Sequence, residues 1–152
     1  MRIIELAVST PVAHPGMTVE QLFMACVEAG VPGIPYRDAK GRIAGKASMR
    51  NMVKVSCLPD FMVKHHHLLG DEIEQLRIPE VKAREMATLE IDSFILDDLP
   101  QVNGDAPISK ALAVMENHDT TYLFVIDDHQ YHGVVTMMTI ARRLLGMMEA
   151  DQ

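Results

Sequence analysis

The sequence predicts an α+β protein built from two similar halves. One order of parts occurs twice between Val19 and Thr136: an amphipathic helix, a short apolar strand ending in Asp, a tight turn, a strand opening with Gly, and a hydroxyl residue that starts a second helix. Val19 aligns with Ile108 and Asp38 with Asp127, both at a separation of 89 residues. A repeat of this length is too long for a solenoid and favours two related half-domains packed together.

In the first copy, the helix is predicted to begin after Thr18, because threonine is favoured at the N-cap. Apolar residues at helical spacing predict its buried face: Val19, Leu22, Phe23, Cys26 and Val27. A short strand then runs to Asp38. A second strand opens with Gly45 and leads to Ser48.

In the second copy, Pro107 is predicted at the first helical position, where proline is favoured. The apolar face of this helix consists of Ile108, Ala111, Leu112 and Met115. The strand over 122–127 is apolar on both of its faces, which is typical of a strand covered on both sides. Gly133 opens the next strand, which leads to Thr136.

The remaining segments complete the predicted organisation. A short segment precedes each copy, over 3–7 and 91–96, so the repeat extends upstream of the helices. Between the copies, residues 60–87 predict an inserted helical hairpin. Its first helix carries Phe61, His65, Leu68, Leu69, Ile73 and Leu76 at helical spacing, and its second runs from Pro79 through Met86. The predicted domains are 1–56, a connector over 57–90, and 91–152.

Composition limits the classes of function. With 21 acidic and 14 basic residues, the 152-residue chain has a net charge of -7, which argues against a nucleic-acid partner because phosphate binding needs clustered Lys and Arg. Cys26 and Cys57 fit a reducing compartment without a disulfide. No segment approaches the ~20 apolar residues of a membrane span, and the N-terminal apolar run is too short for a signal peptide. We therefore expect a cytoplasmic protein without membrane insertion.

The repeated order of parts resembles a tandem CBS-domain protein, or CBS pair. The resemblance rests on the helix, the strand with its Asp, and the two strands Gly45-Lys46-Ala47-Ser48 and Gly133-Val134-Val135-Thr136. It implies two β-α-β-β-α modules packed as a pseudo-twofold pair, with an adenine nucleotide such as AMP, ADP or ATP in the clefts between them. It further implies a ligand-responsive regulatory module that acts as a homodimer on an enzyme or transporter. No other cofactor is predicted.

Ser48 and Thr136 are the first candidate ligand-binding residues. Each starts a helix whose free N–H groups and dipole can hold an anion without a cluster of charged side chains. In the family the third residue after this hydroxyl is commonly an Asp that binds both ribose hydroxyls, whereas this chain has Asn51 and Thr139. Asn keeps an acceptor but no charge, and Thr reaches less far. The departure leaves open a different ligand, one occupied site, or none.

Further candidate residues lie along the strands that flank the clefts: Val12, Ile34, Pro35, Pro100, Val102, Tyr122, Leu123 and Phe124. Arg37 takes the position of the apolar Ile126, so we predict that Arg37, with Lys46 or Arg50, supplies charge for a phosphate. The alternative is that this face of the strand is solvated. Arg142 and Arg143 are assigned to the C-terminal dipole of the last helix.

Two other hypotheses remain. The missing Asp residues favour a ligand-free structural dimerisation module, and the methionines Met137, Met138, Met147 and Met148 suit core or dimer packing. A metal-dependent enzyme would use the run 65–67 of three histidines. Consecutive helical residues point about 100° apart and do not converge on one ion, so no metal site is predicted. The chain has no Gly-x-Ser-x-Gly, Walker or dinucleotide motif, so a non-enzyme is predicted.

Overall fold

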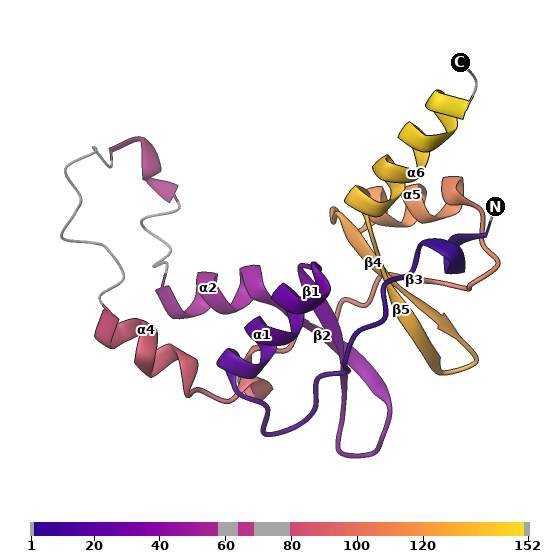
Figure 1. Ribbon diagram of the computed structural model, residues 1–152. Helices are drawn as coiled ribbons and strands as arrows, with labels where there is room; N and C mark the ends of the chain where they lie inside the picture. The colour runs from indigo at the N-terminus through magenta and orange to yellow at the C-terminus, as the bar shows by residue number, and fades with distance from the viewer. Residues whose placement is uncertain (1, 58–63, 69–79, 151–152) are drawn as a thin grey trace.

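Two similar halves lie side by side in the computed structural model, which describes residues 2–57, 64–68 and 80–150 (Figure 1). The first half contains, in order, α1 (Val19–Ala29), β1 (Gly33–Arg37), β2 (Ile43–Ser48) and α2 (Met49–Cys57). The second half contains β3 (Gln101–Val102), α5 (Ile108–Asn117), β4 (Tyr122–Asp127), β5 (Gln130–Thr136) and α6 (Met137–Ala150). The predicted α+β class and its repeat are confirmed.

Each half has a small sheet. In the first, β1 and β2 form an antiparallel hairpin. In the second, the strand order is β3-β4-β5, with β3 parallel and β5 antiparallel to β4. The counterpart of β3 in the first half is a single residue, Ala13, which forms a parallel bridge to Tyr36. Both halves therefore follow the order strand or bridge, helix, strand, strand, helix.

The segments that precede the halves pair with the opposite half. They begin with the 3-10 helices η1 (Ile3–Leu6) and η4 (Ile91–Phe94). After η1, Val8 pairs with Val134 of β5, through backbone hydrogen bonds of 2.8 and 2.9 Å. After η4, Leu96 pairs with Lys46 of β2, through bonds of 2.9 and 3.0 Å. Backbone pairing therefore joins residues that were assigned to different domains. The domain boundaries themselves stay a prediction.

A glycine lies beside each crossing. A Cβ atom on Gly45 would lie 2.4 Å from the carbonyl oxygen of Leu96, and one on Gly133 would lie 2.6 Å from that of Val8. These positions have no room for a side chain because another backbone passes over them. The glycines do not open their strands as predicted, since the hairpin ladders continue beyond them to Ile43 in β2 and Gln130 in β5.

Strand β4 contributes to two hydrophobic cores. Leu123 and Val125 pack in the core of the second half, beneath α5 and α6. Tyr122 and Phe124 point the opposite way and pack in a core that also contains Ile34 and other residues of the first half. The prediction that this strand is covered on both faces is confirmed, and its outer face joins the halves.

Local signals at the helices are largely confirmed. Thr18 caps α1, since its hydroxyl accepts a 3.2 Å hydrogen bond from the Gln21 N–H. Pro107 lies at the N-cap of α5, one residue before the predicted position. The predicted buried face of α1 is wrong for Val27, whose side chain is 71% exposed. The covered face is centred on Leu22 and Cys26, and Val27 is rotated away from it by the helical period.

Part of the connector falls within the described ranges. Helix α4 (Glu80–Ala87) confirms the second predicted connector helix. Most of the first predicted helix, over 61–76, lies outside the described residues. Of its described residues, Lys64 is helical and His66–Leu68 form the 3-10 turn η2. Such a turn also spreads consecutive side chains, by about 120° per residue.

Among the residues that the structure describes, no group of three or more His, Cys, Asp or Glu side chains is arranged to hold a metal ion. In the same ranges, no helix has the length and apolar character needed to cross a membrane.

Candidate functional site

Two clefts lie between the halves at matching places. The first, of about 660 Å³, is bounded by the C-terminal end of α1 and the first turns of α6. The second, of about 720 Å³, is bounded by the end of α5 and the start of α2. Each cleft is therefore formed by the end of one half's first helix and the start of the other half's second helix. Thr136 lines the first cleft and Ser48 the second, so both predicted hydroxyl residues lie at inter-half clefts.

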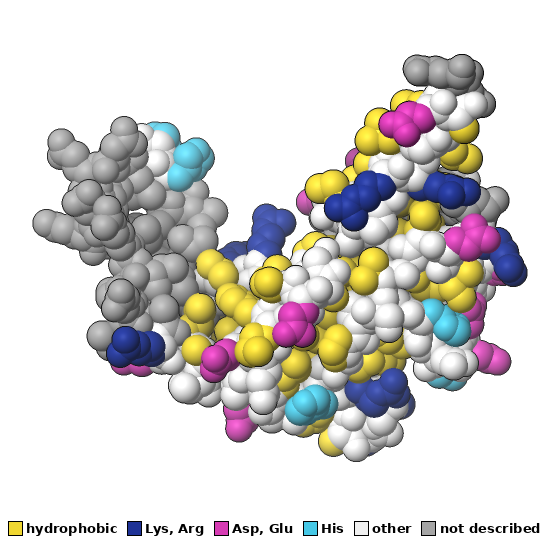
Figure 2. Space-filling model, viewed as in Figure 1, with side chains coloured by type: hydrophobic (Ala, Val, Ile, Leu, Met, Phe, Trp, Pro, Cys, Tyr) yellow, Lys and Arg dark blue, Asp and Glu magenta, His cyan; other side chains and the backbone are white. Residues whose placement is uncertain are grey.

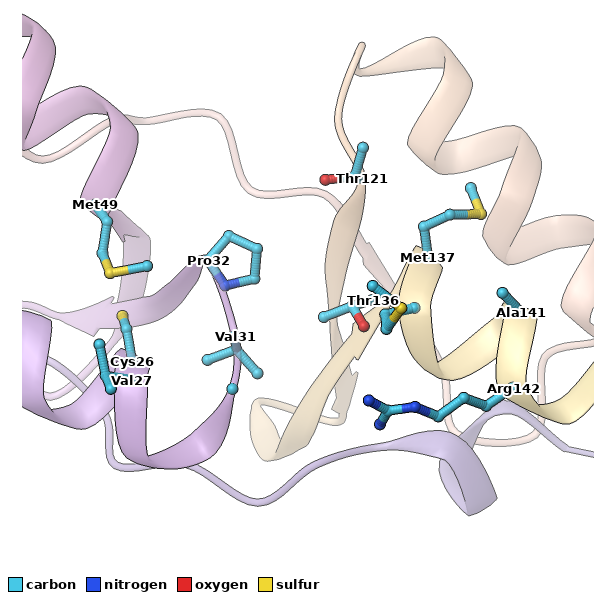
Figure 3. A pocket seen from close by; sticks show the side chains of 12 residues that line it. Cys26, Val27, Val31, Pro32, Met49, Thr121, Thr136, Met137, Ala141 and Arg142 are labelled. Atoms are coloured by element: carbon cyan, nitrogen blue, oxygen red, sulfur yellow. The ribbon is translucent and has the colours of Figure 1, made fainter.

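The first cleft is lined mainly by apolar side chains, and we call it the apolar cleft. In Figure 3, Val31, Pro32 and Met49 of the first half face Met137 and other residues of the second half across the opening. Thr136 and Arg142 add polar groups on the second-half side. The assignment of Arg142 to a helix terminus is wrong, because α6 continues to Ala150 and Arg142 lies at the cleft.

The second cleft, which we call the polar cleft, has charged side chains on both walls. The first half contributes Lys46, Ser48, Arg50, Asn51 and Lys54, and the second contributes Glu116, His118, Asp119 and Tyr122. Cations thus gather on the wall formed by β2 and α2. Carboxylates gather on the facing wall, at the end of α5.

Matching positions explain the contrast between the clefts. Val27 at the end of α1 corresponds to Glu116 at the end of α5, since both lie at the repeat separation of 89 residues. On the opposite wall, Met138 in the apolar cleft corresponds to Arg50 in the polar cleft. The fold is therefore repeated while the chemistry of its two clefts has diverged.

The hydroxyl residues cap the helices that follow them, as predicted. The Asn51 N–H donates to Ser48 Oγ over 3.4 Å, and the Thr139 N–H donates to Thr136 Oγ1 over 3.2 Å. Both hydroxyl side chains are buried. Each helix start is thereby fixed at the edge of its cleft.

The two residues at the expected ribose position are not equivalent. Thr139 Oγ1 accepts from the Thr136 N–H over 3.2 Å and donates to the Thr136 carbonyl over 2.9 Å, so its hydroxyl is engaged in capping. Asn51 Nδ2 donates to the Phe94 carbonyl over 2.8 Å, which orients the amide. Asn51 lines the polar cleft, and its carbonyl oxygen remains able to accept a bond there.

Tyr122 lines the polar cleft, but its hydroxyl is buried beside Gly33. The residue is only 6% exposed, and within the described residues its hydroxyl has no hydrogen-bond partner. Burial raises the pKa of Tyr122, and the neighbouring Ser48 hydroxyl offsets part of that rise without reaching hydrogen-bond geometry. An unpaired buried polar group costs about 1–3 kcal/mol.

Lys46 and Asp98 form an ion pair beside the same cleft. Lys46 Nζ lies 3.7 Å from Asp98 Oδ2, and 5.3 Å from the centroid of the Tyr122 ring. The other oxygen of Asp98 lies 2.6 Å from His118 Nδ1. Asp98 therefore links strand β2 of the first half to the end of α5 in the second.

Several candidate residues have structural positions away from the clefts. Ile34, Leu123 and Phe124 are fully buried in the cores, and Val102 packs there as well. The carbonyl of Pro35 accepts from the Ala13 N–H, and that of Pro100 from the Phe124 N–H. Neither these residues nor Val12 line the two clefts.

Arg37 also lies apart from both clefts. Its guanidinium donates a 2.9 Å hydrogen bond to the Gly41 carbonyl in the β1–β2 turn. The structure therefore brings together Ser48, Asn51 and Tyr122, with Thr136 in the other cleft. Glu116 and Asp119 were not predicted from the sequence as cleft residues. The repeat could have indicated them, because they align with Val27 and Gly30 at the end of the first helix of the other half.

Cys26 in the apolar cleft gives a direct test of burial. Burial raises the pKa of its thiol to about 11. At pH 8 the thiolate fraction is then about 0.1%, so a Cys57→Ser protein should react with a thiol reagent roughly two orders of magnitude more slowly than free cysteine. The measurement is the rate of labelling before and after denaturation. Labelling of the folded protein at the rate of glutathione would contradict the placement of Cys26.

Comparison with known proteins agrees with this geometry. Residues 91–146 match the family model of the CBS domain. No curated protein matches the sequence. A CBS domain-containing protein from Bacillus anthracis str. Ames Ancestor is similar in structure, with a TM-score of 0.65 and 18% identity over 96% of this chain and 94% of that one.

Two further solved structures are similar over nearly the whole chain. One is a CBS domain-containing protein from Kribbella flavida DSM 17836, with a TM-score of 0.65 and 16% identity over 95% of this chain and 99% of that one. The other is the CBS domain pair of protein MJ0100 in complex with 5-methylthioadenosine and S-adenosyl-L-methionine. It has a TM-score of 0.66 and 14% identity over 97% of this chain and 98% of that one. At these identities the likeness establishes the fold.

Proposed function

We propose that this chain, which has the fold of a CBS pair and whose residues 91–146 match the CBS-domain family model, is a non-catalytic regulatory module that binds an adenosine-containing ligand in its polar cleft. The observation that carries this proposal is the convergence of three groups there. Ser48 fixes a helix start, Asn51 presents an acceptor, and Tyr122 of the second half lines the facing wall.

The size and chemistry of the polar cleft fit such a ligand. Its volume of about 720 Å³ is within the usual range for small-molecule sites. The Asn51 carbonyl can accept from a ribose hydroxyl, and the start of α2 can receive a phosphate or another electron-rich group. The similar CBS pair of MJ0100 binds two adenosine derivatives, which supports the same ligand class here.

The position of the cleft supports a regulatory role. A ligand in it contacts Ser48 of the first half and Tyr122 of the second, so its affinity depends on how the halves are placed. Such a ligand shifts the arrangement only if it binds one placement better than another. The connector over 60–87 is the natural segment for an enzyme or transporter to recognise, and this remains a proposal.

A second copy of the chain is the proposed partner in a homodimer. Helix α6 carries exposed apolar side chains at Met138, Leu145 and Met148, and Figure 2 shows apolar atoms spread over this helix. Met24 on α1 is exposed as well. Contiguous apolar surface of this kind marks an interaction site. It also favours the second candidate function, a structural dimerisation module without a ligand.

Thermal unfolding with added ligand separates the two functions. AMP, ADP, ATP, S-adenosylmethionine or 5′-methylthioadenosine at about 100 times its Kd should add ~2.7 kcal/mol, which raises the Tm by roughly 5 to 10 °C. Asn51→Leu should abolish the rise. Asn103→Leu, a change of the same kind at an exposed residue outside both clefts, should retain it. If no ligand raises the Tm and the protein sediments as a dimer, the structural module is the better description.

A further inference from the structure

We propose that the Asp98 carboxylate competes with the ligand for Lys46 in the polar cleft. In the free protein Asp98 pairs with Lys46, and when the ligand binds, its phosphate group replaces Asp98 as the partner of this lysine. The proposal rests on the proposed function and adds a regulatory step to the same site. It makes the cleft selective for a phosphate-bearing nucleotide over the uncharged nucleoside.

Lys46 is a cation that needs an anionic partner. Its side chain is only 8% exposed, and a charge removed from water is stable only when it is paired. Its distance of 3.7 Å to Asp98 Oδ2 is longer than the 2.7–2.9 Å of a close charge-assisted hydrogen bond. The ammonium therefore keeps donors that a better placed anion can use.

Asp98 is easier to displace than Lys46. Its side chain is 47% exposed, so water can solvate the carboxylate once it leaves the lysine. Its second oxygen keeps the 2.6 Å contact with His118 Nδ1. Exchange thus costs the protein little, because neither charged group is left buried without a partner.

The cleft around Lys46 is prepared for an anion by independent groups. Arg50 lines the same wall, and Ser48 fixes the start of α2 there. The ring of Tyr122, which lines the same cleft, lies under the Lys46 ammonium and favours a cation there. A helix start alone would not indicate a ligand, but the buried lysine beside it does.

The residue that corresponds to Lys46 in the second half explains why only the polar cleft should select a phosphate-bearing ligand. Lys46 corresponds to Val134, which is fully buried and apolar. The apolar cleft therefore has no equivalent charge at this place. On the facing wall of the polar cleft, Glu116 and Asp119 oppose additional negative charge. A nucleoside monophosphate is accordingly the suitable probe.

Calorimetric titration of the full chain with AMP and with adenosine tests the exchange. Wild type should bind AMP about tenfold or more tightly than adenosine, and Lys46→Met should bind both alike. Lys40→Met, an equal change of charge in the β1–β2 turn, should behave as wild type. If Lys46→Met does not fold, Lys46→Val, which copies the residue at the matching position, replaces it.

Removal of the Asp98 charge should change the affinity for AMP in the opposite direction to removal of Lys46. Asp98→Asn should raise the affinity for AMP by about three- to tenfold and leave the affinity for adenosine unchanged. The adjacent exposed residue provides a control of equal charge, and Asp97→Asn should change neither affinity. A lower affinity for AMP in Asp98→Asn would overturn the exchange.

The outcomes separate this inference from the function on which it rests. If AMP and adenosine bind wild type equally and Lys46→Met changes nothing, the inference is wrong and the ligand-binding function stands. If neither compound nor any other adenosine derivative binds wild type, the proposed function is wrong and the inference falls with it.

Discussion

Gly45→Ala should cost about 3 kcal/mol or more of the free energy of unfolding, and Gly133→Ala should cost a similar amount. At Gly45 the added methyl group would lie 2.4 Å from the carbonyl oxygen of Leu96, and at Gly133 it would lie 2.6 Å from that of Val8. Both oxygens belong to backbone that is paired with the strand itself, so no flexible side chain can yield. For 152 residues the loss lowers the Tm by roughly 6 to 12 °C.

A third glycine provides the matched control. Gly146 lies in α6, where an added Cβ meets nothing within 4 Å. Gly146→Ala should therefore raise the free energy of unfolding by about 0.5–1 kcal/mol, since alanine is the better helix former. Urea denaturation of the three variants measures these values. Gly45→Ala and Gly146→Ala of equal stability would show that the crossing backbone does not press on β2.

Phe124→Ala should destabilise the protein by about 3–5 kcal/mol, which is a large share of the 5–15 kcal/mol typical of a native protein. The ring is fully buried and lies edge-on to Tyr122, with 5.8 Å between their centroids. It also meets the ring of Tyr131 at 6.4 Å. Because this core contains residues of both halves, the cavity would weaken the contact between them.

The comparison variant is Phe124→Leu, which keeps an apolar side chain and should cost clearly less than alanine. Denaturant unfolding gives the stabilities, and amide exchange in β1 reports whether the first half loosens as well. A loss below about 1 kcal/mol in Phe124→Ala, or amide exchange in β1 that stays at the wild-type rate, would mean that the two halves do not share this core.

The repeat was accessible from sequence because its signals are local. The N-cap at Thr18, the capping by Ser48 and Thr136, and the apolar run of β4 each depend on neighbours within a few residues, and each is confirmed. Two occurrences in one order made the combination specific. The fold could therefore be predicted although no single motif in it is distinctive.

The candidate site was less accessible because it depends on contacts between distant residues. Nothing in the sequence around Asp98 indicates that it meets Lys46 and His118. Val27 has the spacing of a core residue, and only the fold reveals that it faces a cleft. Arg37 has the charge expected of a phosphate ligand, but the turn beside it engages that charge.

The crossing of the two leading segments has a consequence for cooperativity. Val8 adds an edge residue to the sheet of the second half, and Leu96 adds one to the sheet of the first half. The two halves are therefore not independent domains joined by a linker, because each contributes backbone to the sheet of the other. If either half unfolds, the sheet of the other half loses the backbone hydrogen bonds to its edge residue. The unit of folding is then the whole chain, and a change that stabilises one half also protects the other.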